Sequence, residues 1–142
     1  MDFGYKDMGG EPFVVDIEKL TKANRDFRVA KWTGSNLQMT VMAIKPGGEV
    51  GLEVHGDIDQ FLRIEEGTAK VLMGDSEDSL TFEELAEDDF AIFVPAGKWH
   101  NIINTGTTDL KLYSIYAPAE HAKGTVHKTY EEAMAAEAEH HH

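Results

Sequence analysis

The chain has 142 residues, of which 42% are hydrophobic and 27% charged, a composition typical of one globular domain. Its 26 acidic and 13 basic side chains give a net charge of −13, which argues against binding to nucleic acid or an anionic membrane, because both need clustered Lys and Arg. The absence of cysteine excludes disulfides, thiolate metal sites and cysteine nucleophiles. The sequence shows no apolar segment typical of a signal peptide or a membrane span, so we expect a cytoplasmic protein.

The N-terminal region is expected to hold little regular structure. Residues 1–12 are rich in glycine and charge, which favours a loose arm or an edge strand. A short helix is predicted next, with Asp16 as its N-cap and Asn24 near its end. We expect residues 1–36 to form this arm together with a first strand.

From residue 27 onward, short segments of alternating or β-branched residues predict strands. They are residues 27–32, 37–44, 50–55, 60–65, 69–73, 80–82, 90–94, 100–103 and 110–116. Turn-forming residues separate them, and no helical pattern interrupts them, which argues against parallel β–α–β winding. Many short strands at this spacing are typical of an antiparallel sandwich or barrel. The prediction is an all-β protein whose barrel spans residues 37–118.

The C-terminal stretch has a different pattern. Thr129 and Glu132 form a capping box, and residues 133–139 are good helix formers. We therefore expect residues 119–142 to form an arm and a short helix, within one domain overall. The terminal histidines 140–142 are either a purification-tag remnant or a native end, and they are left out of the site.

Glu53 and His55 stand two residues apart in a segment predicted to be extended, so their side chains point to the same face. A carboxylate and an imidazole on an otherwise apolar barrel strand are costly to bury unless something pairs with them. A divalent cation is the natural partner. Gln60 begins the next predicted strand and can offer a carbonyl oxygen to the same point.

His100 brings a second imidazole at the start of a later strand. The candidate ligand set is therefore Glu53, His55, Gln60 and His100. Its mixed nitrogen and oxygen donors suit Mn, Fe, Co, Ni or Zn, and the two imidazoles argue against Ca or Mg. Four protein ligands on an octahedral ion would leave two positions for water or substrate, and an open position is typical of a catalytic metal.

The first of these segments resembles a motif of the cupin superfamily. That motif runs glycine, five residues, His-x-His, three or four residues, Glu, six residues, glycine. Here Gly47 opens it, Glu53 and His55 fill the two histidine places, Gln60 fills the glutamate place, and Gly67 closes it.

The second segment resembles the partner motif, which runs glycine, five residues, Pro-x-Gly, two residues, His, three residues, Asn. Asp89 takes the glycine place, and the positions of Pro95, Gly97, His100 and Asn104 match outright. In the first motif Glu replaces a histidine and Gln replaces the glutamate, so the ligand charge stays at −1. This two-histidine, one-carboxylate set is compatible with a non-haem iron-like site.

The resemblance covers roughly residues 37–116 and implies a double-stranded β-helix, or jelly-roll barrel. It also implies a homodimer, to which the outer faces of residues 27–32 and 37–44 could contribute. The chain is most similar to short bacterial single-domain cupins, a type loosely labelled mannose-6-phosphate isomerase-like. The isomerases themselves are larger, so their activity is not carried over.

Several residues near these motifs have alternative interpretations. Gln60 could bind a metal-bound water instead of the ion, and Asp57 or Asp59 could replace it, although a solvated loop is the more ordinary role for both. His121 and His127 could carry protons at the barrel mouth, but we favour surface or packing roles for them.

Arg63 could bind an anionic substrate or pair with Glu65 on the same strand face. The aromatic residues that could line a pocket or fill the core are Phe61, Phe93, Trp99, Tyr113 and Tyr116.

Two classes of function remain open at this point. In the first, the protein is a metal-dependent enzyme acting on a small oxygen-rich molecule such as a sugar, a keto acid or a hydroxy acid. Isomerisation, decarboxylation and dioxygenation cannot be ranked, because no general base stands out. In the second, the barrel is a non-catalytic binding or sensing module whose metal anchors a small ligand.

Overall fold

The computed structural model describes residues 4–140, with side chains through residue 138. The strands are β1 (Arg28–Thr33), β2 (Gln38–Ile44), β3 (Asp59–Glu66), β4 (Thr68–Gly74), β5 (Phe82–Glu87), β6 (Ala91–Val94), β7 (Trp99–Asn104), β8 (Leu110–Ala117) and β9 (Val126–His127). The helices are α1 (Ile17–Ala23) and α2 (Tyr130–His140). The predicted all-β class is confirmed, and none of the described helices is long and apolar enough to cross a membrane.

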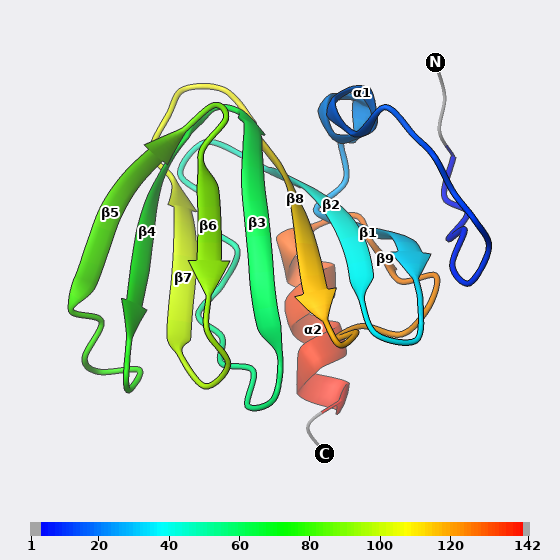
Figure 1. Cartoon of the computed structure of the whole chain (residues 1–142). Helices are drawn as coiled ribbons and strands as arrows, with labels where there is room; N and C mark the ends of the chain where they lie inside the picture. Colours follow the sequence, from blue (N-terminus) through cyan, green and yellow to red (C-terminus); the bar gives the residue numbers. More distant parts are fainter. Residues whose placement is uncertain (1–3, 141–142) are drawn as a thin grey trace.

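The strands form two antiparallel sheets, with the orders β6-β3-β8-β2-β1-β9 and β5-β4-β7, seen from the front in Figure 1. Side chains alternate between the two faces of each strand, so Leu62 and Ile64 on β3 point inward together with Val71 on β4. They pack with Ile102 on β7 and Leu112 on β8 in the main hydrophobic core. This arrangement is a jelly roll whose core holds the two sheets together.

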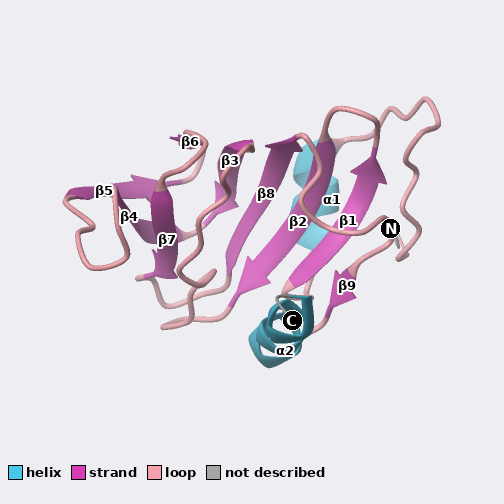
Figure 2. Cartoon of the chain, turned by 90° about the horizontal axis from the view of Figure 1, so that it is seen from below, coloured by secondary structure: helices cyan, strands magenta, loops and turns pink. Residues whose placement is uncertain are grey.

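The two helices lie on opposite faces of the larger sheet (Figure 2). As predicted, Asp16 caps α1, because its side chain accepts a hydrogen bond from the Lys19 backbone N–H (3.1 Å). Leu20 of α1 packs with Val29 and Val41 on the outer face of β1 and β2. That face, expected to contribute to a dimer, is therefore covered by the chain's own N-terminal region.

Helix α2 packs on the inner face and so borders the barrel interior. Thr129 caps it, as the capping box predicted, by accepting a hydrogen bond from the Glu132 backbone N–H (3.1 Å). Ala133 is fully buried, and Tyr130 and Met134 pack against the main core. Histidines 141 and 142 lie outside the described residues.

The predicted strand at residues 50–55 is wrong in detail. Gly51 adopts a φ of 109°, which breaks the regular extended conformation, and the segment forms isolated bridges with β7 instead of a continuous ladder. The predicted strand at residues 80–82 lies further along the chain, as β5. The described part of the N-terminal arm forms no strand, but the Met8 N–H donates to the Lys31 carbonyl (2.9 Å) beside β1.

Candidate metal site

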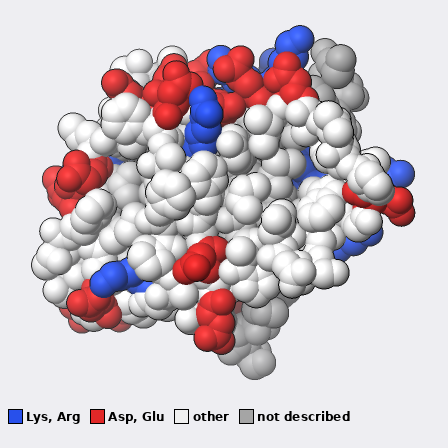
Figure 3. All heavy atoms as spheres, viewed as in Figure 1, with Lys and Arg blue, Asp and Glu red and all other residues white. Residues whose placement is uncertain are grey.

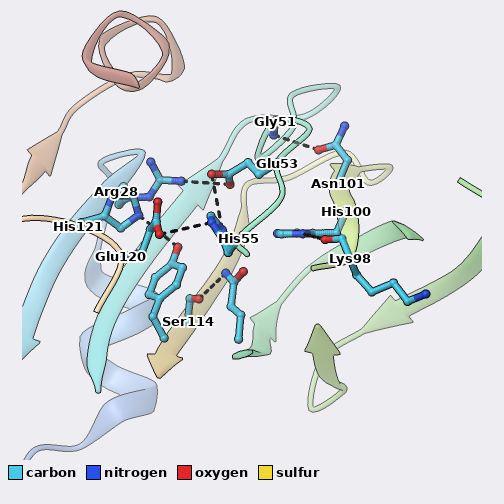
Figure 4. Close-up of polar contacts among 12 residues, drawn as sticks. Arg28, Gly51, Glu53, His55, Lys98, His100, Asn101, Ser114, Glu120 and His121 are labelled. Carbon is cyan, nitrogen blue, oxygen red and sulfur yellow. Dashed lines mark hydrogen bonds and ion pairs between the residues drawn. The ribbon is translucent and has the colours of Figure 1, made fainter. Parts of the chain in front are cut away.

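Three of the four predicted ligands converge inside the barrel. Glu53 and His55 come from the segment between β2 and β3, and His100 comes from β7; one ligand atom from each lies within 4.8 Å of the others. All three side chains are buried, and Figure 4 shows them facing one another. The Gly51 N–H donates to Asn101 Oδ1 (2.9 Å) and ties the segment to β7. The spacing in the sequence therefore predicted a real cluster.

The two histidines present the same ring nitrogen to this cluster. His100 Nδ1 lies 3.1 Å from the Lys98 carbonyl oxygen, and His55 Nδ1 lies 3.4 Å from a Glu120 carboxylate oxygen. Because both partners are acceptors, each Nδ1 carries the proton and each Nε2 keeps its lone pair. Both Nε2 atoms are buried without a hydrogen-bond partner. Unpaired buried nitrogens of this kind fit a bound cation.

Gln60, the fourth predicted ligand, keeps a buried amide oxygen. It is the second residue of β3 and is 4% exposed. In the β3–β8 register it lies opposite Tyr116, whose ring is edge-on to that of His55 with centroids 6.0 Å apart. Its Nε2 donates to Ser114 Oγ (2.8 Å), which leaves Oε1 buried without a hydrogen-bond partner. The amide oxygen is thus available to an ion or to a water bound on one.

The aspartates considered as replacements for Gln60 have other surroundings. Asp57 is exposed, and Asp59 accepts a hydrogen bond from the Ala96 backbone N–H (2.9 Å). Both side chains are exposed to solvent, as the ordinary interpretation predicted, but only Asp57 lies in the loop, since Asp59 is the first residue of β3.

Burial sets the protonation of the cluster. It raises the pKa of Glu53 to about 8, against the opposing effect of the Arg28 guanidinium and with a further increase from Glu137. Burial, followed by the nearby His100 and Arg28, lowers the pKa of His55 to about 4. Burial also lowers the pKa of His100. These shifts favour the uncharged form of all three groups, so an ion bound here would compete with a proton on Glu53.

Arg28 is a neighbour of the site that sequence reasoning missed. It lies on β1, is fully buried, and its Nη2 is 3.9 Å from Glu53 Oε1. Its Nη1 lies 3.4 Å from His127 Nδ1. The alternating pattern of β1 shows which face carries Arg28, but only the folded sheet shows that this face meets Glu53.

A cavity of about 420 Å³ opens onto Glu53 and His55. Its other walls include Trp99, Glu120, His121, His127 and Glu137. His121 and His127 belong to the arm that follows β8 and folds back over the barrel, and their rings pack against each other with centroids 6.3 Å apart. The favoured packing role therefore agrees with these contacts, and proton transfer by the two histidines stays a prediction. His121 Nε2 lies 3.4 Å from the hydroxyl of Tyr116.

The remaining candidates lie away from this cavity. Arg63 pairs with Glu65 (3.0 Å) and Asp89 (2.8 Å). Of its two predicted roles, the ion pair with Glu65 is therefore the one observed. Phe93 is 70% exposed, and its ring packs against that of Phe61 with centroids 5.1 Å apart. The ring of Tyr113 lies next to Phe61, at 6.1 Å.

Comparison with known proteins agrees with this architecture. The Cupin domain model matches residues 40–116. The uncharacterized protein YrkC of Bacillus subtilis is 57% identical over 132 residues, which are 93% of this chain and 71% of YrkC. The crystal structure of BH2720 from Bacillus halodurans has a TM-score of 0.91 at 57% identity, covering 92% of this chain and 98% of that one.

A more distant structure shares the fold alone. It is a predicted oxalate decarboxylase from Thermotoga maritima, with a TM-score of 0.53 at 22% identity, covering 60% of this chain and 69% of that one. The matched domain spans more than half of the sequence, from most of β2 to most of β8, and includes Glu53, His55 and His100. The chain belongs to the cupin superfamily.

Proposed function

We propose that this cupin is a metal-dependent enzyme acting on a small oxygen-rich molecule. The observation that carries the proposal is that Glu53, His55, Gln60 and His100 each keep a buried donor atom without a hydrogen-bond partner. Such atoms are costly to bury, and one ion coordinated by all four would satisfy them together. The donor set suits Mn, Fe, Co, Ni or Zn.

The cavity beside the cluster supports a substrate of sugar-like character. It holds the carboxylates of Glu120 and Glu137, and none of the described residues that line it is Lys or Arg. Carboxylates accept hydrogen bonds from hydroxyl groups and repel anions. Among the expected substrates we therefore favour a neutral sugar over a keto acid or a hydroxy acid.

The chain's own residues supply binding and proton transfer. A bound divalent ion would act as a Lewis acid toward a substrate oxygen. Glu120 and Glu137 would orient substrate hydroxyls, and the Trp99 side chain would contact the carbon skeleton. His121, next to the Tyr116 hydroxyl, can hold or release a proton at its ring.

The test is turnover by protein loaded separately with each of the five metals. Free sugars, keto acids and hydroxy acids are offered, and isomerised or decarboxylated products and oxygen consumption are measured. Turnover that disappears on chelation, returns with metal and is absent in His100→Ala supports the proposal. Stable metal without turnover over the whole panel contradicts it and favours the binding or sensing module.

The homodimer and the cytoplasmic location stay predictions. The face of the larger sheet seen in Figure 3 is mainly uncharged, with acidic side chains gathered along its upper edge. A homodimer, expected from the family resemblance, is testable by sedimentation. The cytoplasmic location is an expectation from the sequence alone.

A further inference from the structure

Glu120 reaches the metal-ligand cluster from outside both sequence motifs. It lies in the arm after β8, and its Oε2 is 3.4 Å from His55 Nδ1 (Figure 4). The His55 side chain is 5% exposed and that of Glu120 is 29% exposed, and both residues line the cavity. A carboxylate at this nitrogen fixes the ring orientation and keeps the lone pair on Nε2.

The arm that carries Glu120 is held by a buried amide, Gln38 at the start of β2. Gln38 Oε1 accepts hydrogen bonds from the backbone N–H groups of Glu120 (3.2 Å) and His121 (2.9 Å). Gln38 Nε2 donates to the His121 carbonyl (2.8 Å) and to Thr33 Oγ1 (2.9 Å). With four hydrogen bonds and no exposed surface, this side chain fixes the backbone on both sides of Glu120.

We infer that Glu120 is a positioning residue that sets His55 for metal binding, and that Gln38 holds Glu120 in place. The inference rests on the proposed metal site. By this inference the arm after β8 positions a metal ligand, although the arm itself contains none of the predicted ligands. Loss of such a partner typically lowers metal affinity by about 10–100-fold.

The experiment compares Glu120→Ala and Glu120→Gln with the wild-type chain. Zn²⁺ affinity is measured by competition with a chelator, and the His55 ring nitrogens are followed by ¹⁵N NMR with and without Zn²⁺. Glu120→Ala should bind Zn²⁺ about 10–100-fold more weakly and lose the fixed Nδ1–H tautomer of metal-free His55. Glu120→Gln should be closer to wild type, since its amide oxygen can still accept from Nδ1–H.

Glu131→Gln is the matched control, because it removes one carboxylate from an exposed position outside the cavity. It should leave both readouts unchanged. If Glu131→Gln lost as much Zn²⁺ affinity as Glu120→Ala, the effect would come from net charge, and the inference would be overturned. Wild-type affinity and wild-type His55 resonances in Glu120→Ala would also overturn it.

Gln38→Leu tests the second half of the inference. Gln38 is not among the predicted ligands, yet its loss should weaken Zn²⁺ binding in the same direction as Glu120→Ala. Unchanged affinity would contradict the role of Gln38. If this variant does not fold, the two Glu120 variants decide the main point alone. If the wild-type chain binds no metal, the proposed function itself is contradicted. This outcome distinguishes a failure of the proposed function from a failure of the Glu120 inference.

Discussion

Glu53 and His100 are joined by their backbones, and their side chains belong to the same buried cluster. The Glu53 N–H donates to the His100 carbonyl (3.0 Å), and the His100 N–H donates to the Glu53 carbonyl (2.9 Å). This antiparallel bridge brings together two residues that are 47 positions apart in the sequence, from the irregular segment and from β7. The main chain therefore fixes the separation of two candidate ligands before any ion is bound, which is the preorganisation that a metal site needs.

Removing any one of the three converging ligands should lower metal content sharply and leave the fold intact. The backbone bridge persists when Glu53, His55 or His100 is changed to Ala, because it uses no side-chain atom. Elemental analysis gives the metal content, and far-ultraviolet circular dichroism reports the β structure. A variant that loses its β signal together with the metal would show that the side chain stabilises the fold instead.

Gln60 should tune the metal more than it retains it. A neutral amide oxygen is a weak donor, so Gln60→Ala should keep much of the metal and gain a bound water. Gln60→Glu should bind the ion more tightly and make it a weaker Lewis acid, because a second carboxylate offsets its charge. Metal titrations of wild type, Gln60→Ala and Gln60→Glu in one buffer measure the differences in metal affinity.

The hydrogen bond from Gln60 Nε2 to Ser114 Oγ offers a control (2.8 Å). Ser114→Ala releases the amide without removing its oxygen, so its effect should be smaller than that of Gln60→Ala. Complete loss of metal in Gln60→Ala, as in His100→Ala, would make Gln60 a primary ligand and contradict this ranking.

Metal affinity should fall as the pH drops below about 8. Burial raises the Glu53 pKa to about 8, so below that pH the metal-free site holds a proton that the ion must displace. One displaced proton lowers the apparent affinity about tenfold per pH unit. Histidine alone, at its ordinary pKa, would place the fall at about pH 6 to 5, but the lowered His55 pKa moves its competition to about pH 4.

Chelator competition from pH 8.5 to pH 5 measures this profile. Glu53→Gln, which has no carboxyl proton to displace, should bind metal more weakly but with a flatter profile. An equally steep profile in Glu53→Gln would assign the proton to another group.

In the metal-free protein, His55 should make stability fall under acid conditions. Its pKa is about 4 when folded and about 6.5 when unfolded, so between these values the unfolded chain binds more protons. Its contribution to the free energy of unfolding is therefore present above pH 6.5 and is lost progressively as the pH falls toward 4.

The comparison of wild type with His55→Gln separates this contribution from the opposite one of Glu53. The raised pKa of Glu53 contributes stability that is fully present below about pH 4.5 and is lost as the pH rises to about 8. Urea unfolding at pH 7 and pH 5 should show wild type losing more stability than His55→Gln. Equal losses would contradict the lowered His55 pKa.

The cluster of Glu53, His55 and His100 could be predicted from the sequence because the three residues sit in local motifs of fixed spacing. Glu53 and His55 share a face by simple alternation, and Pro95, Gly97 and His100 define a recognisable turn and strand start. The helix caps at Asp16 and Thr129 were also readable, since a cap depends on residues within one turn. Local patterns of this kind can be recognised without knowledge of the tertiary fold.

The residues that surround the candidate ligands could not be predicted from the sequence in the same way. Arg28 lies 25 positions before Glu53, and Glu120 lies 65 positions after His55, so their contacts depend on how the sheets and the arm pack. Gly51 looked like part of a strand because its positive φ leaves no mark on the alternating pattern. The cavity and the pKa values follow from these long-range contacts.

The most direct test is the metal content of protein purified without a metal-affinity resin. Elemental analysis is made on the wild type and on the His55→Ala, His100→Ala double variant. Because histidines 140–142 are present in both proteins, any metal they hold cancels in the difference. We expect about one transition-metal ion per chain to depend on His55 and His100, with the β-rich circular dichroism of both proteins preserved. Equal metal content in the double variant would contradict the site.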